Sequence, residues 1–340
     1  MNHRVRLFVT LACIGSGGLS AGCRGTLYRQ TGKVMSGYTV EHMVPALMSD
    51  DDVGMACETG VSMGGFLMSF ERVTDVPEQA GSVTMLSAAM CAEAEAWEAE
   101  LRGLRALHEG RATAAQDARI AEKRAHSLAA RRFLRAFELS EAAFGEVGGA
   151  CPKLDEGEGA FYLLGLSAGL LALIHDRAAE GEAGVPMDIP AKVIRAADCI
   201  EDAKWWGAPG ALKAALWTSV PGSAPEGTDP WAALDTAAAT GEIAGVRLAR
   251  AFQVQAAGAT GRDDLLRTKV TAHAASLVEQ PSNPEWKLLD RYATHLILHE
   301  SDRIWTKNSG HRTPLGALGE FPGASEEPVD DSLLEGLEDE

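Results

Sequence analysis

The chain has 340 residues and a formal net charge of −17, and 46% of its residues are hydrophobic. This length and apolar content are enough for a sizeable core, in one large domain or two packed halves. The strong negative charge argues against nucleic acid and against an anionic lipid surface as binding partners.

The first 22 residues have the order of a secretory signal peptide. Arg4 and Arg6 precede an apolar run at residues 7–14, and small residues lead from Ser20 to Cys23. The apolar run is far shorter than the roughly 20 residues that span a bilayer, so we expect a signal segment and not a permanent anchor. Cleavage after residue 22 would leave Cys23 at the new N-terminus. The alternative is an ordinary signal peptide followed by an incidental cysteine.

Residues 19–23 resemble the lipobox of bacterial lipoproteins, whose cysteine is diacylated. The resemblance implies lipid attachment at Cys23, although Ser20 stands where leucine is commoner. Two or three acyl chains, each contributing about 0.8 kcal/mol per buried methylene, would hold the protein stably at a membrane. Arg24 follows the cysteine, and the absence of aspartate at this position favours the outer membrane over the inner one, with the body facing the periplasm.

Both ends of the mature chain have compositions that disfavour packed structure. Residues 23–49 are expected to be a lipidated tether with at most one short helix, because three glycines and Pro45 interrupt a polar sequence. Residues 308–340 contain three prolines, and the last 15 of them include eight carboxylates. We expect a disordered acidic tail there. The body is then residues 50–307, with halves at about 50–150 and 151–307.

A helical pattern extends through this body. Ala, Leu and Glu recur at three- and four-residue spacings, while alternating β-branched and aromatic runs are missing. Three aspartates at residues 50–52 supply an N-cap and first-turn carboxylates for a helix that extends to Phe70. Further helices are predicted at residues 82–107, 113–144, 159–174, 193–200, 211–219, 230–239, 243–256, 263–279 and 284–304. The paired-helix rhythm predicts an all-α fold of stacked antiparallel hairpins.

Residues 159–174 are the most apolar stretch of the mature chain. A helix that is apolar on every side is a buried one, and a stretch of this length is too short to span a bilayer. A core helix is the favoured interpretation. The alternative is a helix that lines a cavity for an apolar ligand, with Phe161, Leu164, Ala168 and Leu171 as the candidate lining residues.

Four cysteines besides Cys23 lie in the mature body, at residues 57, 91, 151 and 199. In an oxidising compartment an even number favours two disulfides, and the sequence leaves three connectivities open. We favour Cys57 with Cys91, across the first helical hairpin, and Cys151 with Cys199. The alternative is that some of them are small buried side chains with free thiols.

No catalytic or metal-binding motif can be assembled from the sequence. His295 and His299 stand at i and i+4, a spacing that can present two imidazoles to a metal, but the Leu-Ile-Leu between them indicates a mostly buried helix. No CxxC pair, Gly-x-Ser-x-Gly elbow or phosphate-binding loop is present. We therefore expect a protein that is not an enzyme and holds neither a cofactor nor a metal.

Trp205 and Trp206 form a pair in a predicted loop before Pro209. Exposed tryptophans are enriched at interface hot spots, so this pair is a candidate contact with a partner protein. A hydrophobic contact that caps a helix is an equally weighted alternative.

Residues 161–168 fit the first helix of a tetratricopeptide unit, in the pattern aromatic-x2-Leu-Gly-x2-small, and residues 196–203 fit its second helix when residues 181–190 are treated as an insertion. More widely, the chain resembles the TatT-component family of tripartite ATP-independent periplasmic (TRAP) transporter systems, which are helical lipoproteins. The resemblance covers most of residues 50–305. It lies in the lipid cysteine, the helix that opens with Asp-Asp, the 161–168 segment, and the helices at residues 211–221, 265–278 and 288–305.

This resemblance implies a degenerate tetratricopeptide-like solenoid, a homotrimer, and binding to the periplasmic substrate-binding protein of a TRAP transporter. It also implies a channel for a small apolar organic acid. The chain departs from the family in its longer acidic tail, its insertion at residues 181–190 and its glycine-rich linkers. We expect a membrane-anchored adaptor of a TRAP-type transport system that shelters such a ligand. The alternative is a structural or scaffolding envelope lipoprotein with no ligand, and a solid core would favour it.

Overall fold

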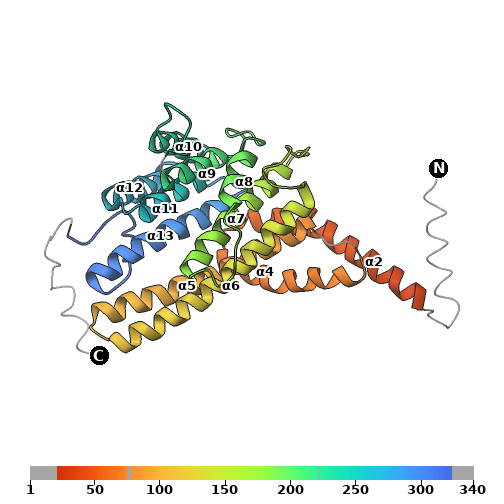
Figure 1. Cartoon of the computed structure of the whole chain (residues 1–340), viewed down its shortest axis with the longest axis horizontal. Helices are drawn as coiled ribbons and strands as arrows, with labels where there is room; N and C mark the ends of the chain where they lie inside the picture. The colour runs from red at the N-terminus through yellow and green to blue at the C-terminus, as the bar shows by residue number, and fades with distance from the viewer. Residues whose placement is uncertain (1–20, 75–77, 221, 324–340) are drawn as a thin grey trace.

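The computed structural model describes residues 21–74, 78–220 and 222–323 (Figure 1). These residues form helices and turns and no strand, so the predicted all-α helical stack is confirmed. Residues 1–20 of the predicted signal peptide and residues 324–340 of the predicted tail lie outside the described residues. The elements are α2 (Ala21–Tyr38), η1 (Thr39–Met43), α3 (Val44–Met48), α4 (Val53–Met68), η2 (Ser69–Arg72), α5 (Glu78–His108), α6 (Ala112–Phe144), α7 (Glu158–Ala178), α8 (Ile189–Ala197), α9 (Ala208–Ser219), α10 (Pro230–Ala244), α11 (Leu248–Ala259), α12 (Asp263–Glu279) and α13 (Lys287–Ser309).

Helices α4 to α7 form a stack in which each helix packs against the one before it (Figure 1). Asp52 begins α4 as the sequence predicts, because its carboxylate accepts a hydrogen bond from the amide of Met55 at 2.8 Å. Residues 109–111 are the whole connection between α5 and α6, so these two long helices form a tight hairpin. Gly60 allows α4 to approach α5, since a Cβ there would lie 2.4 Å from the backbone nitrogen of Ala88.

The second half continues the stack from α8 to α13, and its last helix packs back on the first half. Helix α11 lies at the centre of this half and contacts α9, α10, α12 and α13. Helix α13 then packs along α5, beside which it runs in Figure 1. In an open solenoid each unit contacts only its neighbours. The contact between α13 and α5 therefore closes this stack into one body.

Helix α7 is the core helix of the molecule. It has 21 residues and is longer than predicted. It is the one described helix whose length and composition would allow it to cross a membrane. However, 78% of its most apolar 18-residue segment is buried inside the fold. Its glycines permit this burial. A Cβ at Gly165 would lie 2.0 Å from the Ser140 hydroxyl oxygen, and one at Gly169 would lie 2.6 Å from the Phe137 ring. Gly165, the glycine of the tetratricopeptide-like pattern, is thus a point of close contact between α6 and α7.

The expectation of at most one short helix in residues 23–49 is wrong, because helical structure runs from Ala21 to Met48. The glycine and proline residues that suggested a tether are compatible with these helices. Gly32 faces Phe70 and Thr74 of the neighbouring segment, where a Cβ would lie 2.8 Å from a Thr74 methyl carbon. Pro45 lies at the start of α3, directly after the π-helical turn η1, and such wide turns occur where the regular hydrogen bonding of a helix is interrupted.

The predicted disordered tail is also wrong for residues 308–323, which are ordered against the body. Thr313 donates its amide hydrogen to Asp302 (3.0 Å), and the indole of Trp305 donates to the carbonyl oxygen of Glu320 (3.0 Å). The ring of Phe321 packs against the core and lies under the guanidinium of Arg267. Composition alone suggested disorder, but these turn residues find fixed partners on α12 and α13.

The described residues contain two disulfides. One joins Cys57 of α4 to Cys91 of α5, and the other joins Cys151, in the loop before α7, to Cys199, just after α8. These are the two pairs that the sequence favours. Each one connects segments that are already neighbours in the helical stack.

Replacing both Cys57 and Cys91 with serine is expected to lower the free energy of unfolding by about 2 to 4 kcal/mol. The cross-link spans a sequence separation of 34 residues, and it removes loop-closure entropy from the unfolded chain. Urea denaturation of the oxidised protein and of the variant measures the difference. The matched control is Ser62→Ala, an exposed change on the same helix, which should stay within about 0.5 kcal/mol of the wild type. A loss below about 1 kcal/mol in the double variant would contradict this account.

Candidate functional site

Three cavities follow one another along α7. The first, here the proximal chamber, has a volume of about 440 Å³ and is enclosed by α3, the start of α7 and the segment before α13. The second, the waist, has about 30 Å³, and the third, the distal chamber, has about 230 Å³ and lies between α7, α9 and α11. Met48 and Leu164 line both the proximal chamber and the waist, while Leu171 and Phe252 line both the waist and the distal chamber. The three cavities therefore form a row with shared walls.

The walls of this cavity row are mainly apolar. Val44, Pro45 and Trp286 are among the apolar residues that line the proximal chamber, and Leu212 and Leu216 line the distal chamber. Ligand pockets of this kind combine hydrophobic walls with a few polar groups that orient the ligand. The waist has room for about one water molecule, so it separates the two chambers in the structure as it stands.

Three of the four predicted lining residues face these cavities. Phe161 lines the proximal chamber, Leu164 lines that chamber and the waist, and Leu171 lines the waist and the distal chamber. Ala168 is fully buried and lines none of the three. Its expected role as a lining residue is wrong, because a side chain this small on a fully packed helix lies behind its neighbours.

Polar groups lie at the distal end of the row. Arg177 lines the distal chamber and is exposed, and within the described part of the chain it forms no ion pair. Ser167 and Gln255 also line the chamber; the Ser167 hydroxyl donates to the carbonyl oxygen of Leu163 (2.9 Å). A guanidinium at the rim of an apolar chamber can pair with a carboxylate whose hydrocarbon part lies inside.

Several lining residues were missed by the sequence prediction. Met48 belongs to a segment that was expected to be a tether, and Phe252 and Trp286 lie far from α7 in the sequence. The apolar pair Val44 and Met48, four residues apart, was the available sign of a packed helix face. Phe252 and Trp286 reach the cavities only through the packing of the helices, so no local sequence pattern predicts their position.

The expected exposure of Trp205 and Trp206 to a partner is wrong, because both side chains are buried. Their rings contact each other and the ring of Trp286, with centroids 5.5 Å, 6.2 Å and 4.9 Å apart. Trp206 has a positive φ of 58° and lies in the turn directly before α9. The tryptophan pair therefore supports the Trp286 wall of the proximal chamber and is not a contact surface.

His299, one of the two histidines of α13, contacts Glu100 and Trp97 of α5. The imidazole of His299 lies 3.0 Å from the Glu100 carboxylate and stacks on Trp97, with ring centroids 4.6 Å apart. The described residues contain no group of three or more His, Cys, Asp or Glu side chains that could hold a metal ion. His299 thus joins α13 to α5 through its contact with the Glu100 carboxylate and through a ring stack.

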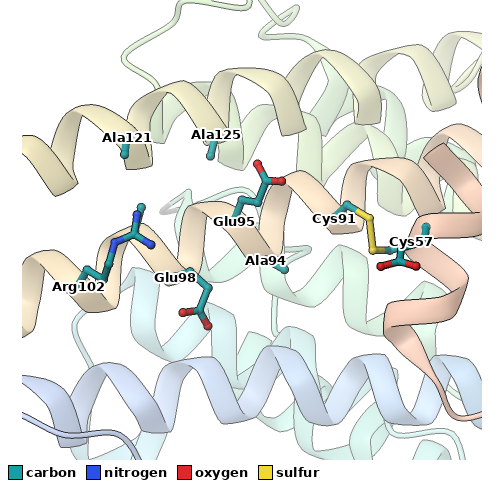
Figure 2. Close-up of a pocket in the computed structure, with 10 residues that line it drawn as sticks. Cys57, Cys91, Ala94, Glu95, Glu98, Arg102, Ala121 and Ala125 are labelled. Atoms are coloured by element: carbon teal, nitrogen blue, oxygen red, sulfur yellow. A yellow bond between two sulfur atoms is a disulfide. The ribbon is translucent and has the colours of Figure 1, made fainter. Parts of the chain in front are cut away.

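A further groove, of about 560 Å³, lies on α4, α5 and α6 (Figure 2). The Cys57–Cys91 disulfide stands at one end of it, and Glu95 points toward α6 while Glu98 points away from it, as Figure 2 shows. The remaining lining comes from Glu58, Ala94, Ala99, Arg102, Ala121 and Ala125. Its charged residues do not converge on a common point, so this open groove is a weaker candidate than the cavity row.

Searches among protein-family models, curated proteins and solved structures found no match to this chain.

Proposed function

We propose that the protein is an exported lipoprotein, anchored through Cys23, that shelters a small apolar ligand in the cavity row along α7. The observation that supports this most directly is the set of three adjoining, mainly apolar cavities beside the core helix. Burial of hydrocarbon in such chambers is favourable by roughly 25 cal/mol per Å². Arg177 at the distal rim suits a carboxylate, so the proposed ligand is a small apolar organic acid.

The resemblance to the TatT-component family suggests the setting for this binding. In that setting the protein is an adaptor of a TRAP-type transport system, faces the periplasm from the outer membrane, forms a homotrimer, and receives or delivers ligand through a periplasmic substrate-binding protein. The mouth of the distal chamber is the surface proposed for that partner. Ile174, Met187 and Val220 expose 51%, 66% and 54% of their surface, and they lie on or beside segments that line the chamber. Exposed apolar side chains around a mouth are typical of protein contacts.

Filling the distal chamber tests the proposal. Ala215 lines that chamber and is half-buried, so Ala215→Phe should occupy part of its 230 Å³ without disrupting the core. The expected result is at least a tenfold loss of affinity for a dansyl-labelled medium-chain fatty acid, measured by fluorescence titration of the mature protein. The matched control is Ala94→Phe, the same substitution in the open groove of Figure 2, which should leave the affinity unchanged.

Membrane fractionation and native mass spectrometry complete this test. A membrane-bound protein that copurifies with a small organic acid supports the whole proposal. If the protein is membrane-bound but has no copurified ligand and no affinity for the probe, the proposed function is wrong and the protein is a scaffolding lipoprotein. If the wild type and Ala215→Phe bind the probe with equal affinity, the probe does not bind in the distal chamber.

A further inference from the structure

Helix α2 reaches outward from the helical stack, and one side of it packs on the segment that follows α4 (Figure 1). Gly32 is the one buried residue between residues 24 and 38, and it faces Phe70 and Thr74. On the same side, Arg29 Nε donates to the carbonyl oxygen of Val73 (3.0 Å). The remaining surface of these residues is at least partly exposed.

Three apolar side chains of α2 form a stripe on its outer side. Leu27, Val34 and Tyr38 expose 61%, 66% and 55% of their surface. They are seven and four residues apart, and because a helix has about 3.6 residues per turn, they share one face. Gly32 stands two residues before Val34, which places it on the opposite side. This outer stripe therefore points away from the body.

Helix α2 is not expected to be stable in water while this stripe is uncovered. It contains Gly25, Gly32 and Gly37, and glycine is among the weakest helix formers. A helix of this length gains most of its stability from the packing of its apolar face. No described residue covers the outer stripe, so we expect an external surface to complete the packing of α2.

The charge of α2 differs from that of the whole chain. Its charged residues are Arg24, Arg29 and Lys33, and no carboxylate occurs between residues 21 and 40. None of these three cations forms an ion pair with a described residue. The net charge of −17 argues against an anionic surface, but at physiological ionic strength salt screens charges that are more than about 8 Å apart. With 18 residues α2 is about 27 Å long, so the carboxylates of the body act weakly on its outer end, and its own cations favour an anionic partner.

The residue proposed to carry the lipid falls on the same face of α2. Position 23 is four residues before Leu27, about one helical turn away, so by helical spacing acyl chains attached there would share the face of the outer stripe. A helix with apolar residues on one face and basic residues beside them lies in the interface between lipid and water. Tyrosine favours the level of the lipid headgroups. A second copy of the chain fits this surface less well, because two α2 helices in a symmetric contact would bring the same cations together.

We propose that α2 lies on an anionic phospholipid surface, with Leu27, Val34 and Tyr38 in contact with the lipid and Arg24 and Lys33 beside the headgroup phosphates. The part played by position 23 rests on the proposed function, whereas the outer stripe and its cations do not. The five residues of η1 separate α2 from α3, which lines the proximal chamber. Binding of α2 therefore holds that chamber close to the lipid surface.

Vesicle cosedimentation tests this surface on the chain of residues 24–340, which keeps α2 from Arg24 onward and all of the body, and carries no acyl group. It should bind vesicles of phosphatidylcholine with about one third phosphatidylglycerol, more weakly as salt is added, and should not bind vesicles of phosphatidylcholine alone. Val34→Asp should weaken binding about tenfold or more, because it places a negative charge in the outer stripe. The matched control is Val278→Asp, the same substitution at a valine of α12 that is 89% exposed, and it should bind like the wild type.

The basic residues are tested in the same assay. Lys33→Gln should weaken binding about fivefold, since it removes one of the charges that the anionic lipid attracts. Lys287→Gln, at the exposed lysine that begins α13, is the matched control and should leave binding unchanged. Amide hydrogen exchange of residues 24–38 should slow on the vesicles, while exchange in α12 stays as it is in solution.

The outcomes separate this surface from the rest of the proposed function. No binding to the anionic vesicles, or equal losses in Val34→Asp and Val278→Asp, would overturn the proposal. An oligomer that Val34→Asp dissociates in solution, without vesicle binding by the wild type, would assign the outer stripe to a second copy and also overturn it. Mass spectrometry of the membrane-bound protein shows separately whether Cys23 carries acyl chains. Vesicle binding by the 24–340 chain together with an unmodified Cys23 would refute the proposed anchor and leave this surface standing.

Discussion

Replacing Arg247 with alanine is expected to lower the free energy of unfolding by roughly 3 to 5 kcal/mol, because it leaves the buried carboxylate of Asp290 without its charged partner. Both side chains are buried, and Arg247 Nη1 lies 2.6 Å from Asp290 Oδ2. The guanidinium also donates to the hydroxyl and carbonyl oxygens of Ser276 and to the carbonyl oxygen of Gln280. This one side chain therefore joins the start of α11 to α12 and α13.

Urea denaturation at neutral pH measures this loss. The matched control is Arg291→Ala, which breaks the ion pair between Arg291 and Asp51. The side chains of these two residues are 48% and 62% exposed. Such exposed pairs contribute about 0 to 1 kcal/mol, so the control should unfold almost like the wild type. Equal effects of the two substitutions would mean that burial does not decide the strength of the Arg247 pair. The double variant Arg247→Met with Asp290→Leu should recover most of the stability, since it leaves no unpaired charge.

The helices of the body could be predicted because their signals are local. The Asp52 N-cap, the break at Gly110 and the repeated spacing of alanine and leucine each act within a few residues of the helix they define. The boundaries of α6 and α12 accordingly agree closely with the sequence prediction. Neither helix depends on a distant partner for its start or end.

The terminal segments could not be predicted, because their order depends on distant contacts. Gly32 marks a flexible segment when only the sequence is considered, yet in the fold it is the point where α2 touches Phe70. In the same way, residues 310–323 carry a turn-rich sequence whose partners, Asp302 and Thr271, lie on α13 and α12. The composition of a segment contains no information about contacts with residues that are distant in the sequence, so it could not predict this order.

The sequence predicted the α7 residues that line the candidate site, but it did not predict the lining residues on other helices. The apolar sequence of α7 indicated either a core helix or a cavity lining, and the structure shows that the same helix has both kinds of contact, with Leu163 packed in the core and Phe161 facing the proximal chamber. Tyr292 and Phe252 come from other helices and carry no sign of their position in the sequence. A cavity is formed between elements, so its full lining follows only from their packing.

Lowering the pH from 6.5 to 4.5 is expected to remove about 2 kcal/mol of stability through His273 alone. This imidazole is fully buried, and its pKa is lowered to about 3, first by burial and then by the charge of Arg247. A histidine with a lowered pKa is neutral in the fold and takes up a proton on unfolding, so its contribution is complete above the unfolded pKa near 6.5. Each pH unit below that value removes about 1.4 kcal/mol until the folded pKa is reached.

The window between pH 6.5 and 4.5 separates the titration of His273 from that of Glu100. Burial alone would raise the pKa of Glu100, but His299 and Arg303 hold it at about 2, so its contribution is complete above pH 4.5 and declines only below it. The free energy of unfolding of His273→Leu should therefore fall less steeply than that of the wild type between these two pH values. Thr294, the hydrogen-bond partner of His273, keeps a second bond to the carbonyl oxygen of Asp290 and is not left unsatisfied. His311→Asn, which removes an exposed imidazole, should follow the wild-type curve, and parallel curves for all three proteins would show that His273 is not the acid-sensitive group.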